Sequence, residues 1–179
     1  MGSRGPAFES RRPDQNPQPP HARGRPVASP ETLIVSWEDL DRLVEQLAVQ
    51  VGREYDVLLA ITRGALVPAG MLAYRLGLRN ILVAAVAFYD EAGRPAERPS
   101  FLQFPADPLL HDRRVLIVDE VWDTGSTIQA VIDRVRLAGG RPTTAVLHYK
   151  PARSRVPSVP DHHVVRTDAW VVYPFKAGR

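Results

Sequence analysis

The sequence contains no cysteine, only two lysines among its 23 basic residues, and no long apolar segment. The absence of cysteine excludes disulfide bonds, thiolate metal ligands and a cysteine nucleophile, and it fits a reducing compartment such as the cytoplasm. No apolar run approaches the ~20 residues of a membrane-spanning helix, and no apolar centre of a secretory signal follows Met1, so we expect no membrane partner. An apolar fraction of 44% is nevertheless enough for a folded core.

The formal net charge of +3 is distributed unevenly along the 179 residues. Residues 1–30 contain five arginines, two acidic residues and seven of the 17 prolines, whereas residues 31–179 carry equal numbers of acidic and basic residues. The first segment is therefore predicted to be a disordered tail, and residues 31–179 to form one domain. The tail is either dispensable or a tether to RNA or to a membrane surface. The neutral domain argues against a nucleic-acid partner for the folded part.

Apolar and amphipathic segments alternate along residues 31–179. Continuous apolar runs, which are typical of strands buried on both faces of a sheet, occupy residues 56–61, 81–88, 114–118 and 144–149. Helices are expected directly after Ser36 and over residues 68–76 and 127–138, and one or two short strands over residues 164–172. The alternation predicts an α/β fold with a mostly parallel sheet flanked by helices.

Three polar segments interrupt this pattern and indicate where a ligand would bind. Residues 62–65 and 119–126 follow buried strands, and in parallel sheets ligands bind beyond the carboxyl ends of the strands. Residues 90–112 are longer, polar and contain four prolines. They are predicted to form a loop, and loops of this length are usually functional.

The segment after the third predicted strand has the most informative polar residues. The strand delivers Asp119 and Glu120 to its end, and the turn Asp-Thr-Gly-Ser-Thr follows at residues 123–127. Backbone N–H groups, hydroxyls and a glycine at the start of a helix form a cradle for phosphate. Acids beside such a cradle are expected if the ligand also has sugar hydroxyls or a magnesium ion. A helix cap formed by Asp123 or Ser126 is a simpler explanation of the turn, but it does not account for the two acids.

This segment resembles the diphosphoribosyl-binding signature of type I phosphoribosyltransferases. The resemblance implies that Asp119 and Glu120 hold the ribose hydroxyls of phosphoribosyl diphosphate and that the turn holds its 5′-phosphate. It also implies a magnesium ion, Mg2+, held near Asp119 mainly through substrate and water. The turn residues concerned are Thr124, Gly125, Ser126 and Thr127.

Residues 61–69 resemble the pyrophosphate loop of the same family. The resemblance implies that Arg63 and the backbone amides of Gly64 and Ala65 meet the diphosphate group. Ala65 departs from the second glycine that is often present, which puts in doubt an unusual backbone conformation there. Taken alone, a strand-to-helix turn with one surface arginine would explain this stretch equally well.

The C-terminal part resembles the bacterial xanthine–guanine phosphoribosyltransferases, and the resemblance extends over residues 34–175. It depends on the Lys150-Pro151 pair after a strand and on a later Asp168-Ala169-Trp170 run. It implies a small C-terminal hood in which Lys150 donates to the carbonyl of an oxopurine, Trp170 stacks on the ring and the Val171 backbone reads the base edge. An ammonium group favours a carbonyl acceptor over the amine of adenine. Alternatively, Lys150 is a solvated loop residue and Trp170 belongs to the core.

Together the resemblances imply a purine salvage enzyme, a cytoplasmic homo-oligomer that transfers ribose-5-phosphate from phosphoribosyl diphosphate to guanine, xanthine or hypoxanthine and releases pyrophosphate. Asp123 is the candidate general base for the purine proton, or else it only caps the following helix. Residues 90–112 match the position of the family's mobile catalytic loop, which would exclude water. The alternative is a regulatory protein of the same fold that senses phosphoribosyl diphosphate or nucleotides and binds RNA.

Overall fold

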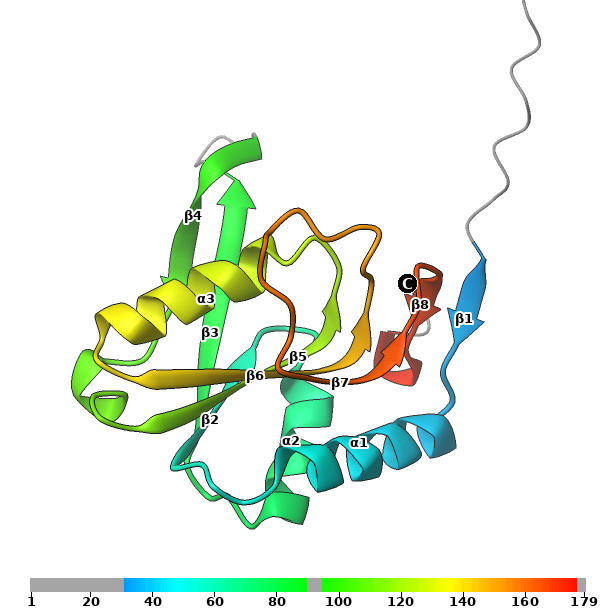
Figure 1. Cartoon of the computed structure of the whole chain (residues 1–179), viewed down its shortest axis with the longest axis horizontal. Coiled ribbons are helices and arrows are strands. Elements are labelled where there is room, and N and C mark those ends of the chain that lie inside the picture. Colours follow the sequence, from blue (N-terminus) through cyan, green and yellow to red (C-terminus); the bar gives the residue numbers. More distant parts are fainter. Residues whose placement is uncertain (1–30, 90–94, 177–179) are drawn as a thin grey trace, which may run out of the picture.

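The computed structural model describes residues 31–89 and 95–176. A six-stranded sheet has the order β4-β3-β2-β5-β6-β7, and every neighbouring pair is parallel except the antiparallel pair β3–β4. The predicted α/β fold with a mostly parallel sheet is therefore confirmed (Figure 1). The strands are β2 (Val57–Ile61), β3 (Ile81–Tyr89), β4 (Pro95–Gln103), β5 (Arg114–Trp122), β6 (Arg141–Tyr149) and β7 (His162–Arg166).

Helices cover both faces of this sheet. α1 and α2 pack on one face and α3 packs on the other, so that alternate residues of β5 enter two different cores. Leu116 and Val118 contribute to the core under α1 and α2, whereas Val115 and Ile117 contribute to the core under α3. Burial on both faces explains why the strands are apolar throughout. The helices are α1 (Trp37–Val51), α2 (Leu66–Leu76) and α3 (Ser126–Leu137).

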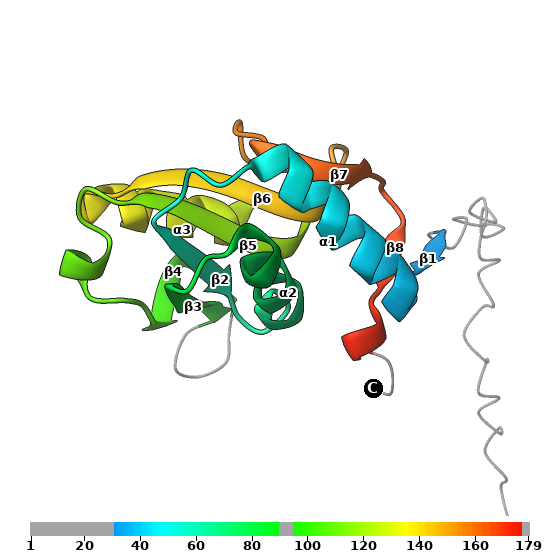
Figure 2. The same ribbon diagram turned by 90° about the horizontal axis from the view of Figure 1, so that it is seen from below.

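A second, two-stranded sheet forms a hood beside the carboxyl ends of the main strands. It pairs β1 (Thr32–Ile34) with β8 (Trp170–Val172) in parallel, and Figure 2 shows this pair at one end of the molecule. The Trp170 N–H group donates to the Glu31 carbonyl at 2.7 Å. A short 3-10 helix, η2 (Pro174–Lys176), follows β8. The structure thus adds an N-terminal strand to the hood that the sequence placed in the C-terminal part alone.

Two segments differ from the expected pattern. β5 continues to Trp122, so Asp119 and Glu120 lie within a strand and not in the following turn. Residues 90–112, expected to be a loop, include the edge strand β4 and a 3-10 helix at Asp107–Leu109. Prolines are tolerated on edge strands because no neighbouring strand requires an N–H donor on the outer side. The prolines of β4 therefore made this strand look like a loop in the sequence. Residues 1–30 and 90–94, which hold the predicted tail and part of the predicted loop, lie outside the described residues.

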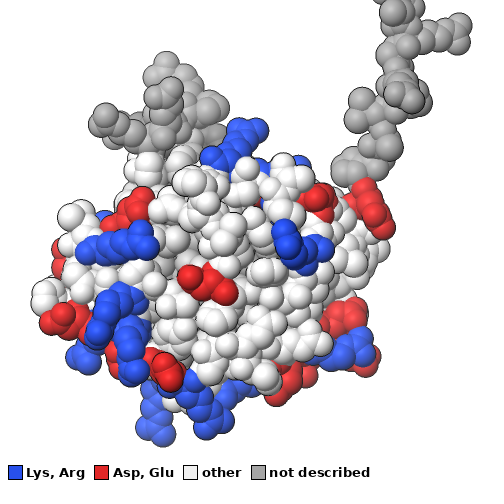
Figure 3. All heavy atoms as spheres, in the orientation of Figure 1, with Lys and Arg blue, Asp and Glu red and all other residues white. Residues whose placement is uncertain are grey.

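Charged side chains of both signs are interspersed on the face of the molecule that Figure 3 shows. This agrees with the neutral balance of residues 31–179 in the sequence. Within residues 31–89 and 95–176, no helix combines the length and the apolar character needed to cross a membrane.

We expect Leu116→Ala to lower the free energy of unfolding by roughly 2–5 kcal/mol, because its side chain is fully buried and a cavity would remain. Urea denaturation followed by circular dichroism measures the loss. Leu137→Ala is the control, since Leu137 is 79% exposed and its truncation should change stability by less than about 0.5 kcal/mol. Equal losses in both variants would contradict the packing described for β5.

Candidate active site

The turn between β5 and α3 can accept only glycine at position 125. Gly125 has φ of 79°, and a Cβ atom there would lie 2.5 Å from both the Trp122 Nε1 and the Val156 Cγ2 atoms. The Trp122 ring is itself fully buried and donates to the Ser154 hydroxyl at 3.2 Å. The backbone therefore passes close to a rigid ring, which fixes the start of α3.

A hollow of about 80 Å³ lies at this turn. It is lined by Asp119, Val121, Asp123, Thr124, Gly125, Thr127 and Ile128. Gly125 is the N-cap of α3, and the side chain that accepts from the Ser126 N–H group, at 3.4 Å, is that of Thr124, so the alternative in which Asp123 acts as the cap is wrong. Free N–H groups, hydroxyls and the positive end of the α3 dipole meet in this hollow, and together they favour an anion.

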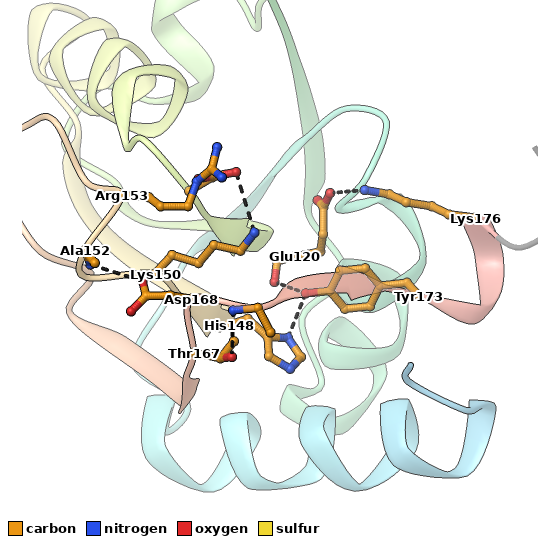
Figure 4. A network of polar contacts seen from close by, with 11 residues as sticks. Glu120, His148, Lys150, Ala152, Arg153, Thr167, Asp168, Tyr173 and Lys176 are labelled. Atoms are coloured by element: carbon orange, nitrogen blue, oxygen red, sulfur yellow. Dashed lines mark hydrogen bonds and ion pairs between the residues drawn. The ribbon is translucent and has the colours of Figure 1, made fainter. Parts of the chain in front are cut away.

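The two neighbouring acids of β5 have different surroundings. Burial, followed by the charge of Glu120, raises the pKa of Asp119 well above its ordinary value. Burial also opposes ionisation of Glu120, but hydrogen bonds with Asp119 and Lys176 outweigh it and hold the pKa of Glu120 below its ordinary value. The Glu120 carboxylate accepts from the Lys176 ammonium at 2.5 Å (Figure 4).

Glycine is also required at position 64, on the turn after β2. A Cβ atom at Gly64 would lie 1.9 Å from the Glu120 Oε2 atom, so this turn and the end of β5 approach each other directly. Arg63 is exposed beside a cavity of about 380 Å³ that Gly64, Phe175 and Lys176 also line. Ala65 has ordinary helical angles, φ of −75° and ψ of −14°, so no unusual conformation is needed there.

A third cavity, of about 290 Å³, separates the end of β6 from the hood. It is lined by Val121, Asp123, Lys150, Trp170, Val171, Val172, Tyr173 and Lys176. Lys150 is only 3% exposed, and its Nζ atom lies 5.5 Å from the centre of the Trp170 ring. Trp170 is 56% exposed. A solvated Lys150 and a core Trp170, the alternatives left open by the sequence, are therefore both excluded.

Asp123 stands between the hollow at the turn and the cavity under the hood, since it lines both. Its carboxylate accepts from the Arg153 guanidinium at 2.5 Å and lies 3.6 Å from the Lys150 ammonium. The loop that follows β6 is fastened to the turn, because the Arg155 N–H group donates to the Thr124 carbonyl at 2.9 Å. Two cations thus hold Asp123 at the junction of two cavities.

A buried hydrogen-bond chain connects the hood to β5. The Tyr173 hydroxyl donates to the Glu120 carbonyl at 2.6 Å and lies 2.7 Å from the His148 Nδ1 atom (Figure 4). Because the hydroxyl has one proton, the His148 Nδ1–H group must donate to it. Burial, followed by the charge of Lys150, lowers the pKa of His148 to about 4, so the ring is neutral near neutral pH.

The structure brings the predicted site residues together at one edge of the sheet, as the parallel topology required. Arg63, Gly64 and Ala65 follow β2, the two acids lie in the last residues of β5 before it ends at Trp122, and the hood residues line a cavity together with Asp123. Sequence reasoning missed two contributors, Lys176 and Tyr173. Lys176 is one of only two lysines in the sequence, but its partner Glu120 lies 56 residues earlier, and no local sequence pattern indicates a contact over that separation.

We expect the variant His148→Asn to weaken the pH dependence of stability. In the native chain the folded-state pKa of about 4 lies below the ordinary 6.5, so the unfolded chain binds the proton first as the pH falls. Between about pH 7.5 and about pH 4.5 this group alone should cost the native protein roughly 2–3 kcal/mol. Urea titrations of both proteins at the two pH values measure the difference. An unchanged pH dependence in the variant would contradict a neutral, buried His148.

Comparisons with known proteins agree with this geometry. The family model described as "Phosphoribosyl transferase domain" matches residues 36–177. A xanthine-guanine phosphoribosyltransferase of Idiomarina loihiensis is 29% identical over 148 residues, which cover 80% of this chain and 86% of that protein.

Two solved structures share the fold at a TM-score of 0.72. One is a purine phosphoribosyltransferase of Pyrococcus horikoshii, 34% identical, with 83% of this chain and 96% of that chain covered. The other is a Neisseria gonorrhoeae protein with bound ppGpp, 27% identical, with 84% and 92% covered. With the motifs and the arrangement of cavities described above, these matches establish that the chain belongs to the phosphoribosyl transferase domain family.

Proposed function

We propose that the protein is a purine salvage enzyme that transfers ribose-5-phosphate from phosphoribosyl diphosphate to a 6-oxopurine and releases pyrophosphate. One observation supports this above all others. Three cavities at the carboxyl edge of the sheet adjoin through shared residues. Asp123 lines both the hollow at the turn and the cavity under the hood, and Lys176 lines both the cavity under the hood and the cavity beside Arg63. The two proposed substrates together have three matching parts, because phosphoribosyl diphosphate supplies a phosphorylated sugar and a diphosphate and the purine supplies the base.

The sugar phosphate is proposed to bind at the end of β5. The 5′-phosphate would enter the hollow at the turn, where the N–H groups and hydroxyls of Thr124, Gly125, Ser126 and Thr127 would donate to it. Asp119 and Glu120 would accept hydrogen bonds from the ribose hydroxyls. Holding the sugar at both ends restricts it to a reactive orientation.

The diphosphate group would occupy the cavity beside Arg63. The guanidinium of Arg63 and the amides of Gly64 and Ala65 would bind its oxygens, which stabilises the charge that develops as the pyrophosphate leaves. The closeness of Gly64 to Glu120 places this group next to the sugar.

A magnesium ion fits the same region. Among residues 31–89 and 95–176 no group of three acidic or histidine side chains could hold a metal ion alone. Magnesium at phosphate sites usually takes one or two carboxylates and completes its shell with water and phosphate oxygens, and the carboxylate of Asp119 meets that need. When bound, the ion would neutralise charge on the diphosphate.

The base is proposed to lie in the cavity under the hood. The indole of Trp170 is exposed toward it and offers a flat surface for a purine. Lys150, buried at its edge, would donate to the 6-carbonyl, and the Val171 backbone would meet the base edge. A buried donor discriminates strongly against a base that lacks the matching acceptor, because it would be left unpaired.

Asp123 is proposed to accept the purine proton. Glycosyl transfer passes through a transition state that resembles an oxocarbenium ion, so the incoming nitrogen attacks a carbon that has almost lost its leaving group. The nitrogen must then lose its proton, and Asp123 lies where the sugar and base cavities meet. The ion pairs with Arg153 and Lys150 keep its carboxylate at that junction.

The proposal includes a homo-oligomer in the cytoplasm, as the family resemblance implies. The lack of cysteine is consistent with a reducing compartment.

Purified protein supplied with Mg2+ and phosphoribosyl diphosphate should convert at least one of guanine, xanthine and hypoxanthine to its nucleotide, and it should leave adenine unreacted. Chromatographic detection of nucleotide and of released pyrophosphate measures the reaction. Absence of turnover with all four bases would refute the enzymatic function. Efficient turnover of adenine would refute the role proposed for Lys150.

Asp123→Asn should lower kcat on the order of 10²–10⁴-fold, which is the usual contribution of a general base. Asp133→Asn is the matched control, because it removes the same charge from an exposed position of α3. Steady-state kinetics with the best purine measures both. Full activity of Asp123→Asn would remove Asp123 from the chemistry.

A further inference from the structure

Lys176 occupies an unusual place for a residue so near the C-terminus. It ends η2, and its side chain, 46% exposed, reaches back across the hood to the Glu120 carboxylate (Figure 4). Its ammonium also lies 5.5 Å from the centre of the Tyr173 ring. Lys176 lines the base cavity and also the cavity beside Arg63, so one flexible cation faces both parts of the candidate active site.

Lys176 is paired with Glu120, the acid that is proposed to bind the ribose hydroxyls of the substrate. In the proposed reaction Glu120 accepts hydrogen bonds from the ribose hydroxyls, and in the structure its Oε1 atom is bound by Lys176. Tyr173, three residues earlier, holds the carbonyl of the same Glu120. The two contacts from one turn therefore fix both the backbone and the side chain of this acid before the sugar arrives.

The cavity beside Arg63 needs more positive charge than one arginine supplies. A diphosphate carries several negative charges, and the Glu120 carboxylate stands close to Gly64, which lines the cavity where it would bind. The other nearby lysine, Lys150, is buried and paired with Asp123 in the base cavity. Among residues 31–89 and 95–176, Lys176 is the second cation that lines this cavity beside Arg63, and it does so on a half-exposed, flexible four-carbon side chain.

We propose that Lys176 exchanges partners when substrate binds, releasing Glu120 to the ribose hydroxyls and binding the diphosphate group together with Arg63. The inference rests on the proposed function and assigns a further substrate-binding residue within it. Lys176 is 46% exposed but the Glu120 side chain is only 9% exposed, so the exchange requires the ribose hydroxyls to replace the ammonium group at Glu120 as Lys176 leaves. Lys176 would thus neutralise Glu120 in the free protein and the leaving group in the complex.

The test compares two ligands that separate these two contacts. Isothermal titration with Mg2+ and pyrophosphate probes the diphosphate contact alone, and titration with the nucleoside monophosphate product probes the ribose contacts. Lys176→Gln should weaken pyrophosphate binding roughly 10- to 100-fold, the usual worth of a hydrogen bond to a charged group, and change nucleotide binding by less than about threefold. Lys176→Arg should retain most of the pyrophosphate affinity.

Arg113→Gln is the matched control, because it removes one positive charge at the opposite end of β5, where the residue is exposed. It should leave both affinities unchanged. Unchanged pyrophosphate binding in Lys176→Gln would overturn the proposal, and so would an equal loss for both ligands, which would limit Lys176 to positioning Glu120. Failure of the native protein to turn over any purine would refute the proposed function, while the pyrophosphate titrations would still test Lys176.

Discussion

Two neighbouring carboxyl groups at the end of a buried central strand repel each other, and much of the surrounding structure accommodates them. Asp119 accepts a hydrogen bond from the Glu120 N–H group at 2.8 Å, while Lys176 neutralises the Glu120 side chain. Tyr173 binds the Glu120 carbonyl, and the lack of a side chain at Gly64 leaves space for the carboxylate. The hood and the turn after β2 therefore both contact Glu120.

The site residues easiest to predict were those that lie next to one another in the sequence. The acids of β5 and the turn at 123–127 are contiguous, and a parallel sheet necessarily brings the ends of β2, β5 and β6 to one edge. β4 escaped prediction because its prolines suit an edge strand as well as a loop. Tyr173 and Lys176 escaped because their partner, Glu120, lies more than fifty residues away, so that only the folded chain relates them.

The three cavities differ in character although they adjoin. The hollow at the turn combines the backbone and hydroxyl groups of Thr124, Gly125 and Thr127 with the carboxyl groups of Asp119 and Asp123, which suits a phosphate that is attached to a sugar. The base cavity combines an aromatic face with a buried ammonium group, which suits a flat ligand with a carbonyl. Asp123 stands at the boundary of the sugar-phosphate and base cavities and Lys176 at the boundary of the base and diphosphate cavities, and both are held by ion pairs, so charge is concentrated around the position where the purine would replace the diphosphate on the sugar.

The pairing of β1 with β8 joins the start of the described chain to its end. Thr32 is in register with Trp170, and the Glu31 carbonyl accepts from the Trp170 backbone, so the aromatic wall of the base cavity is supported by the first strand. The described chain thus begins beside the base cavity, because Glu31 contacts Trp170 and Trp170 lines that cavity. Any truncation, fusion or bound partner that displaces β1 would remove a strand from the hood, so binding of the base would depend on a strand that lines none of the three cavities.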